Sequence, residues 1–249
     1  MKKPKIKFNN RLLIYLGIIL AITGLYFYTT RDLIFSIAIL ILSSLFFFLL
    51  FEKKYSTYLK REKKTKECIQ FVNNFIITLS ITNSVSSTYE TLKESFNNDL
   101  KEIDQSISSL NVEDKIASLR DYFDLRIYDV FLKLLDQYLF NGGDILKISQ
   151  LLMFDTRKLD STLEDYKLKT RRKLVEFITM WGFTMLVLVI IQVSLSIFYD
   201  AILKMSFYPI AIFVFFVVFF AFAYVFTSQV YNLSFVSYSE VKINEKHKK

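Results

Sequence analysis

The stretch LIFSIAILILSSLFFFLLF, residues 33–51, contains no charged side chain over its whole length. A helix needs about 20 such residues to cross the roughly 30 Å hydrocarbon core of a membrane. Three further runs share this property, and the last of them has Pro209 in its first turn, where proline costs a helix little. The sequence therefore predicts four transmembrane helices, over residues 12–30, 33–51, 177–199 and 207–227.

The length of these runs decides the fold class. They exceed the 10–14 apolar residues of a helix buried in a soluble core, which argues against a soluble protein. The first run lacks a small-residue cleavage site and a second run follows at once, so we interpret it as an uncleaved anchor. We predict an all-α, polytopic membrane protein, with two N-terminal transmembrane helices, a cytosolic helical bundle at 52–174 and two C-terminal transmembrane helices.

Basic residues cluster beside the apolar runs and give the chain a net charge of +8. The clusters lie in the N-terminal segment 1–11, directly after the second run, at Arg171, Arg172 and Lys173 before the third run, and in the tail 228–249. The two short connections carry only Arg31 and Lys204. Because cytoplasmic loops hold the excess of Lys and Arg, we expect a multi-pass protein of the cell (cytoplasmic) membrane with both termini in the cytosol.

This charge pattern makes the lipid membrane the expected partner and argues against nucleic acid. The cations gather where the chain leaves the membrane, while the 52–174 segment mixes acidic and basic residues almost evenly. Juxtamembrane cations favour anionic lipid head groups. Within the apolar runs only tyrosines ionise, which disfavours a transporter or proton relay, since those functions usually need intramembrane charges.

The sequence offers no catalytic, metal or cofactor site. Cys68 and His247 are each the only residue of their type, so no internal disulfide and no Cys or His metal site can be assembled. A catalytic Cys–His pair or Ser–His–Asp triad cannot be assembled either, because His247 is the only histidine. Paired carboxylates such as Asp121 and Asp124 fit solvated helix faces. We therefore expect no enzyme activity, no cofactor and no metal.

The 52–174 segment shows helical periodicity with few breaks. Its first part is expected to continue the second membrane helix, and nothing interrupts helicity from residue 145 into the third. Between these ends, the predicted helix starts are a capping box at Ser87 and Glu90, Asn111 before an acidic first turn, and Asp124 as an N-cap.

Apolar side chains from Ile127 to Leu139 recur at helical spacing and form one continuous stripe. The stripe ends at Gly142 and Gly143, and Asp144 fits the N-cap of a following helix. A phosphate-binding Walker A loop has a different spacing and follows a strand, and a nucleotide cyclase needs a mixed α/β domain. We interpret this segment as a tight turn between antiparallel helices and as a candidate partner contact.

The stretch FLKLLDQYLFNGGDILKISQLLMFDTRKLDSTLEDYKLKTRRKLVEF, residues 131–177, resembles the F-domain of type II secretion and type IV pilus platform proteins. That family shows a helix, a glycine, an amphipathic helix and a basic stretch that enters the membrane. Here Gly142 or Gly143 matches the glycine, and residues 171–173 match the basic exit. The resemblance covers roughly residues 68–199. A single such domain between two pairs of membrane helices resembles the tight-adherence (Tad) branch.

The resemblance implies a platform protein, not an enzyme. Such a protein couples a cytosolic hexameric ATPase to the assembly of pilin or pseudopilin subunits. The helical bundle would contact the secretion or pilus ATPase, and the membrane helices would contact pilin-like subunits. One F-domain per chain implies a second copy, supplied by the protein itself or by a second F-domain protein. The chain departs from the family where Asn83-Ser84 and Asn111-Val112 stand at positions that commonly hold glycine.

Small residues on the first membrane helix suit contact with another helix. Gly17, Ala21 and Gly24 lie on one side, and small residues at this spacing let helices approach closely. Packing within the chain explains them equally well. The alternative to a platform is a membrane adaptor or sensor, whose helical bundle relays a signal or scaffolds another complex.

Overall fold

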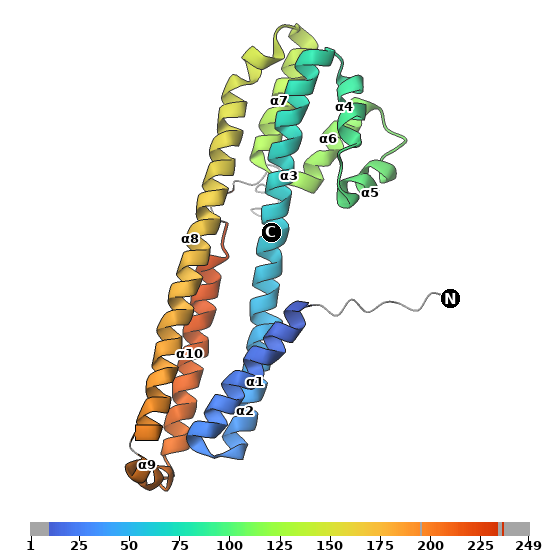
Figure 1. The fold of residues 1–249 in the computed structure, drawn as a ribbon. Coiled ribbons are helices and arrows are strands. Elements are labelled where there is room, and N and C mark those ends of the chain that lie inside the picture. The colour runs from blue at the N-terminus through green and yellow to red at the C-terminus, as the bar shows by residue number, and fades with distance from the viewer. Residues whose placement is uncertain (1–9, 195, 234–235, 237–249) are drawn as a thin grey trace, which may run out of the picture. The chain divides into compact units, whose positions relative to one another are not determined.

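The computed structural model describes residues 10–194, 196–233 and 236, and these residues form helices without any strand (Figure 1). Packing divides the chain into two compact units. The first, here called the membrane unit, comprises Met1–Tyr58 and Lys169–Asn232. The second, the helical unit, comprises Leu59–Leu168 and Leu233–Lys249. The predicted all-helical fold is confirmed for the described residues.

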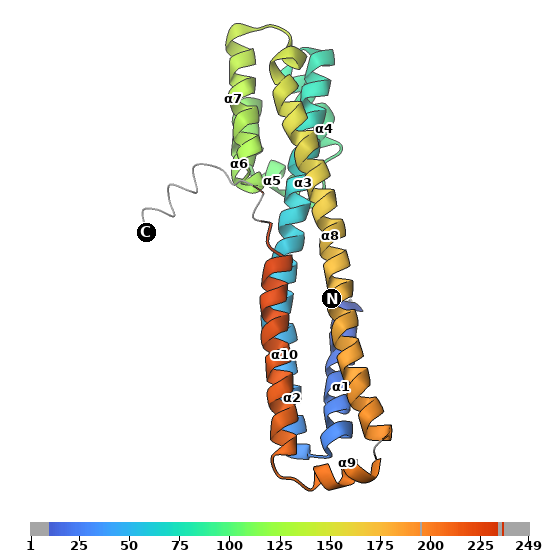
Figure 2. The same cartoon turned by 90° about the vertical axis from the view of Figure 1, so that its left-hand side faces the viewer.

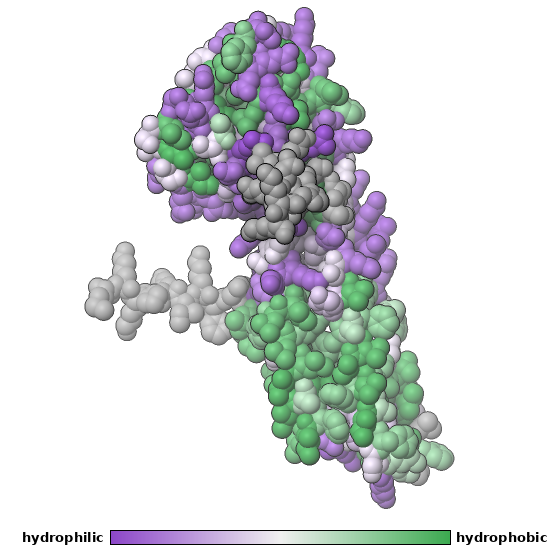
Figure 3. All heavy atoms as spheres, turned by 180° about the vertical axis from the view of Figure 1, so that it is seen from behind, coloured by the Kyte–Doolittle hydropathy of each residue, from purple (hydrophilic) through white to green (hydrophobic). Residues whose placement is uncertain are grey.

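The membrane unit contains the apolar helices. Its elements are α1 (Asn10–Thr30), α2 (Leu33–Leu45), the π-helix η1 (Phe46–Phe51), the start of α3 (Glu52–Thr82), the end of α8 (Ile145–Ser194), α9 (Ser196–Leu203) and α10 (Tyr208–Val230). Four helical stretches are long and apolar enough to cross a membrane, and hydrophobic residues cover this part of the surface (Figure 3). The chain is therefore a multi-pass membrane protein, as the four charge-free runs predict.

The helix boundaries add two features to the expected spans. The second span, 33–51, changes from α-helix to π-helix at Phe46 and returns to α-helix at Glu52. The third span, 177–199, takes its last residues from α9, because α8 ends at Ser194. Basic residues of 1–9 and 237–249 lie outside the described residues.

A polar turn joins α1 to α2. Arg31 adopts a left-handed backbone with a φ of 53°, and Asp32 follows as the N-cap of α2. The Asp32 carboxylate accepts hydrogen bonds from the backbone N–H groups of Ile34, at 2.9 Å, and Phe35, at 3.1 Å. Because the first N–H groups of a helix have no partner within it, this cap completes the hairpin between two apolar helices.

The core of the membrane unit joins α1, α2 and α10. Tyr26, Ile39 and Phe216 are buried together, with the rings of Tyr26 and Phe216 in an edge contact at 5.6 Å. The Tyr26 hydroxyl donates to the backbone oxygen of Pro209 at 2.8 Å. Pro209 lies in the first turn of α10, as predicted, where no helical N–H is lost.

The helical unit contains the rest of α3 and α8 and four shorter helices (Figures 1 and 2). The shorter helices are α4 (Val85–Lys93), α5 (Asn98–Ser106), α6 (Val112–Phe123) and α7 (Arg126–Asn141). Asn97 and Asn111 cap α5 and α6, each by accepting a hydrogen bond from a backbone N–H at 2.8 Å. The predicted helix start at Asn111 is confirmed.

Two predicted caps in this unit are wrong. The capping box at Ser87 and Glu90 does not start α4, because Ser84 is its N-cap and accepts from the backbone N–H of Ser87. Asp124 does not start α7 but ends α6, with a left-handed backbone at a φ of 52°. Leu125 takes the N-cap position of α7 without a side-chain hydrogen bond.

Aromatic rings hold the helical unit together. Phe71 on α3 is buried, and its ring centre lies between 5.7 and 6.1 Å from the centres of five other rings. These rings belong to Phe75, Phe96, Phe123, Tyr128 and Phe131. Phe71 thus links α3 to α6, α7 and the connection between α4 and α5.

We predict that Phe71→Ala destabilises the helical unit by about 3–5 kcal/mol, the usual cost of removing a buried phenylalanine ring. The measurement is urea unfolding of the full chain in detergent micelles, followed by circular dichroism. The matched control is Phe154→Ala, at a position that is 63% exposed, which should change the unfolding free energy by less than about 0.5 kcal/mol. Equal effects of the two substitutions would contradict this account of the core.

Candidate interaction site

Polar contacts set α8 beside α3 within the helical unit. Thr156 Oγ1 donates to Asn73 Oδ1 at 2.7 Å, and Lys167 Nζ lies 3.0 Å from Glu62 Oε1. Residue numbers rise along one helix as they fall along the other, so the two helices run antiparallel. The connection from α7 to α8 consequently lies at the same end of the unit as the end of α3 (Figures 1 and 2).

The turn between α7 and α8 consists of Gly142, Gly143 and Asp144. Gly142 has a φ of 66° and Gly143 a φ of 108°, a backbone that other residues rarely adopt. The Gly142 N–H donates to the backbone oxygen of Tyr138 at 2.8 Å and closes α7. Asp144 Oδ1 accepts from the N–H of Leu146 at 3.0 Å and opens α8. The helix end predicted at the two glycines is found there.

Large apolar side chains are exposed on either side of this turn. Phe140, at the end of α7, is 89% exposed, and Leu151 and Phe154 on α8 are 74% and 63% exposed. Leu151 and Phe154 are three residues apart and therefore share one helix face. We call these three residues the apolar tip. Exposed apolar surface beyond isolated residues usually marks an interaction site in a protein surrounded by water.

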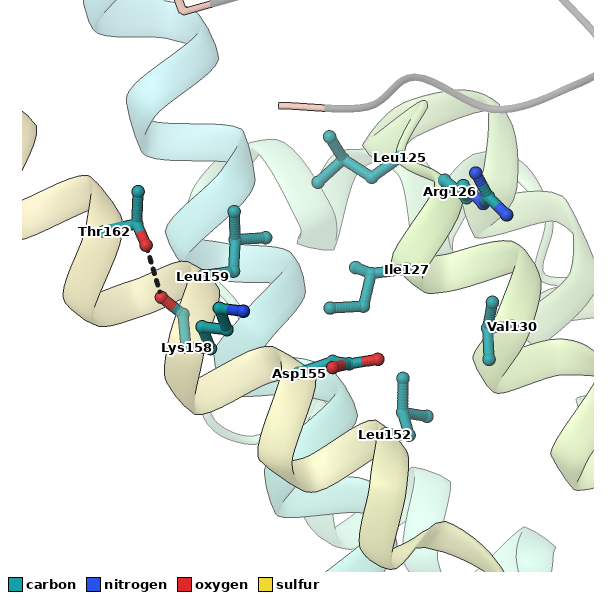
Figure 4. Close-up of a pocket in the computed structure, with 9 residues that line it drawn as sticks. All are labelled: Leu125, Arg126, Ile127, Val130, Leu152, Asp155, Lys158, Leu159 and Thr162. Atoms are coloured by element: carbon teal, nitrogen blue, oxygen red, sulfur yellow. Dashed lines mark hydrogen bonds between the residues drawn. The ribbon is translucent and has the colours of Figure 1, made fainter. Parts of the chain in front are cut away.

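A groove of about 470 Å³ lies between α7 and α8 (Figure 4). Its apolar lining consists of Leu125, Ile127, Val130, Leu152 and Leu159. Asp155 extends between the two helices, and Thr162 Oγ1 donates to the Lys158 backbone oxygen at 2.8 Å (Figure 4). The outer part of the predicted α7 stripe thus borders an open groove, whereas Phe131 and Leu135 are buried.

Two buried carboxylates of the helical unit are neutralised by cations. Asp104, which is 2% exposed, accepts from the Tyr89 hydroxyl at 2.8 Å and pairs with Lys93 Nζ at 2.9 Å. Burial alone would raise the pKa of Asp104, but the hydrogen bonds from Lys93 and Tyr89 outweigh it and lower that pKa. Arg120 Nε lies 2.6 Å from Asp129 Oδ1. The lowered pKa keeps Asp104 ionised at neutral pH. The two ion pairs join α4 to α5 and α6 to α7.

Cys68 lies in the core of the helical unit. Burial raises the pKa of its thiol well above the ordinary value, so the thiol stays protonated and poorly nucleophilic. Among the described residues, no three His, Cys, Asp or Glu side chains are placed to hold a metal ion.

The other predicted site residues lie in the membrane unit. Arg171, Arg172 and Lys173 are exposed on α8. The small-residue face of α1, formed by Gly17, Ala21 and Gly24, is also exposed, and a Cβ added at either glycine would meet no atom within 4 Å. Within the described residues this face packs against no other helix, so intramolecular packing does not explain it. Its role in binding a partner stays a prediction.

The apolar tip was not among the residues singled out from the sequence, and the part of the stripe that lines the groove was predicted only as an apolar helix face. The available signal was that Phe140 and Leu151 fall outside the regular apolar spacing of their helices, since Leu135 and Leu152 are the residues that become buried. The groove gave no signal, because an apolar residue on a helix face looks the same whether it meets a core or a cleft.

No family model, curated protein or solved structure matches the chain. The fold and the site therefore define the class by themselves: a multi-pass membrane protein that carries a separate helical unit with an exposed apolar tip. The resemblance to platform proteins stays a hypothesis based on the sequence pattern.

We predict that Gly142→Val destabilises the helical unit, because a β-branched residue resists a φ of 66°. Such backbone strain typically costs about 1–3 kcal/mol. The measurement is the urea midpoint of the full chain in detergent micelles. The control is Asn141→Val, at the exposed last residue of α7, which should shift the midpoint much less. Equal shifts would show that the turn does not need glycine.

Proposed function

We propose that the protein is a platform subunit of a pilus or secretion assembly machine in the inner membrane. It couples a cytosolic ATPase to the assembly of pilin or pseudopilin subunits. The observation that carries this proposal is the apolar tip, where Phe140, Leu151 and Phe154 are exposed beside the Gly142–Gly143 turn. In sequence this helical unit stands between two pairs of apolar helices, the order that the F-domain resemblance leads us to expect.

A departure from the family pattern is compatible with the proposal. Asn83 stands where platform proteins commonly have glycine, and it adopts a left-handed φ of 52° between α3 and α4. Asparagine tolerates this conformation better than most residues. This position therefore requires a left-handed backbone, a conformation that glycine adopts readily and that Asn83 adopts here.

The charge distribution supports an orientation with the helical unit in the cytosol. The short α1–α2 and α9–α10 connections carry few basic residues, whereas basic residues follow α2 and precede the apolar part of α8. By the positive-inside rule the short connections face outward. In this orientation the apolar tip is available to a cytosolic ATPase.

The exposed face of α1 supports contact with a second membrane protein. Gly17, Ala21 and Gly24 leave open space beside the helix, and close approach of backbones is what drives helices together in lipid. A pilin-like helix, a second copy of this chain or a second F-domain protein fits this face. In the proposed assembly machine, this face of α1 would contact the pilin or pseudopilin subunits.

We predict that a cysteine at Ala201 is labelled by a membrane-impermeant maleimide in intact cells, while a cysteine at Asn98 is labelled only after the membrane is opened. Both positions are exposed in the structure, so access depends on the side of the membrane. Native Cys68 is buried and should contribute little background. Labelling of the Asn98 position in intact cells would reverse the orientation and contradict a cytosolic ATPase contact.

The ATPase contact itself gives a second prediction. The full chain should co-purify with a secretion-type ATPase of the same cells, and Phe154→Ser or Leu151→Ser should weaken that complex at least about tenfold, equivalent to about 1.4 kcal/mol. Leu168→Ser is the matched control, because Leu168 is a 66% exposed leucine on the same helix, roughly 20 Å or more from the tip at 1.5 Å per residue.

Three results separate the proposal from its alternative. Loss of ATPase binding in the tip variants, with normal binding by Leu168→Ser, supports the platform. Normal binding by the tip variants shows that the apolar tip is not the ATPase contact. A chain that binds no assembly ATPase but captures a signalling partner through the same residues would instead be the membrane adaptor or sensor.

A further inference from the structure

An apolar crevice of about 530 Å³ lies within the membrane unit. Its walls come from α1, η1, the segment of α8 where its apolar part begins, and the second half of α10. The α1 residues that line it run from Arg11 to Ile22, and the α8 residues run from Leu174 to Ile178. At the other end of α1 a hydrogen bond joins α1 directly to α8: Gln192 Nε2 of α8 donates to the Tyr28 backbone oxygen at 3.0 Å.

The π-helix η1 builds one wall of this crevice. Phe46, Phe47 and Phe51 all line it. The Phe47 ring stacks on Tyr15 of α1 at 5.8 Å, and the Tyr15 hydroxyl donates to Glu52 Oε2 at 2.6 Å. π-helical segments are rare and occur often at functional sites. Here the segment points three aromatic rings toward the space beside α1.

Positive charge lies at the mouth of the crevice. Arg11 is part of the lining, and its guanidinium lies 5.4 Å from the centre of the Tyr55 ring. Arg171 precedes Leu174 by three residues and shares its face of α8, together with Ile178, while Arg172 faces away from that side. An apolar cavity with Arg11 in its lining, and with Arg171 one turn before the lining residues of α8, is complementary to a molecule with an apolar tail and an anionic head.

The size of the crevice restricts what fills it. A helix is about 10 Å across and rises 5.4 Å per turn, so one turn occupies roughly 400 Å³. The crevice extends along α1 from Arg11 to Ile22, roughly 16 Å at 1.5 Å per residue, a length over which a helix makes about three turns. The crevice is therefore too narrow to enclose a second transmembrane helix. A flexible hydrocarbon chain does fit, and such chains surround the membrane unit.

We propose that the crevice binds one acyl chain of an anionic phospholipid, whose phosphate contacts Arg11 and Arg171. The lipid forms a specific part of the membrane unit, bound at the basic end of α1 and α8. This site is independent of the platform function, because it rests only on the apolar walls, the two arginines and the membrane location of the unit.

Trp181 is a built-in reporter for this site. It is the only tryptophan of the chain, and its ring lies 4.7 Å from Phe219 and 6.2 Å from Phe177, both of which line the crevice. Bromine atoms on an acyl chain quench tryptophan fluorescence only at short range. Because Trp181 is also partly exposed beside the crevice, lipid around the unit quenches it too. The difference between quenching by an anionic and by a neutral brominated lipid therefore reports occupation of the crevice.

The experiment reconstitutes the full chain in phosphatidylcholine vesicles that contain a rising fraction of brominated phosphatidylglycerol. A parallel series uses brominated phosphatidylcholine, which has the same chains without a net negative charge. We expect phosphatidylglycerol to reach half-maximal quenching at a fraction at least about five-fold lower, as one cation near a membrane surface contributes about that factor. Identical curves for the two lipids on the wild-type protein would overturn the proposal.

Matched variants locate the site. Arg11→Gln and Arg171→Gln should bring the two quenching curves together, whereas Arg172→Gln should keep them apart. Ile18→Phe should reduce quenching by filling the crevice, while Leu20→Phe, on the same helix but outside the lining, should not. If Arg172→Gln acts like Arg171→Gln, the lipid is attracted by general surface charge and the assigned site is wrong.

Native mass spectrometry in detergent tests the competing occupant. One retained phospholipid per chain, lost in Ile18→Phe, supports the proposal. A dimer that retains no phospholipid shows that a second copy covers the crevice, and this result overturns it. Should any variant fail to fold, the comparison of the two lipids on the wild-type protein still decides.

Discussion

Every backbone N–H and C=O group in the hydrocarbon of a membrane must find its hydrogen-bond partner inside the protein. Helices meet this demand along each charge-free run, and the difficult places are their ends. In the polar connection between α1 and α2, the Asp32 carboxylate accepts hydrogen bonds from the first N–H groups of α2. The hairpin of α1 and α2 therefore depends on this cap.

The same demand permits η1, because a π-helix also keeps its backbone hydrogen bonds within the chain. What changes is the direction of its side chains. Phe46 meets Phe220 of α10 at 5.3 Å, Phe47 meets Tyr15 of α1, and Phe51 approaches Tyr231 at 5.9 Å. One short aromatic segment thereby contacts both α1 and α10, and it forms a wall that a regular α-helix would place differently.

Much of this fold could be predicted because its signals are local. A charge-free run, an asparagine before acidic residues and two adjacent glycines each act through their own backbone, so the apolar helices and the ends at Asn111 and Gly142 were predictable. The Ser84 cap was not, because Ser87 satisfies the same pattern and only the left-handed Asn83 decides between them. Neither η1 nor the groove beside α7 has a sequence signal, since packing alone distinguishes them from ordinary apolar helix faces.

Exposure of an apolar residue has a different meaning in the two units. On the membrane unit an exposed leucine is in contact with lipid chains as apolar as itself, so it indicates no partner, and only shape and charge distinguish one site from another. That is why the crevice with Arg11 is informative while the many exposed residues around it are not. In contact with water, Phe140 and Phe154 of the helical unit each leave apolar surface unburied at a cost of about 25 cal/mol per Å². Covering these rings would recover this free energy, which is why exposure at the apolar tip is informative and exposure on the membrane unit is not.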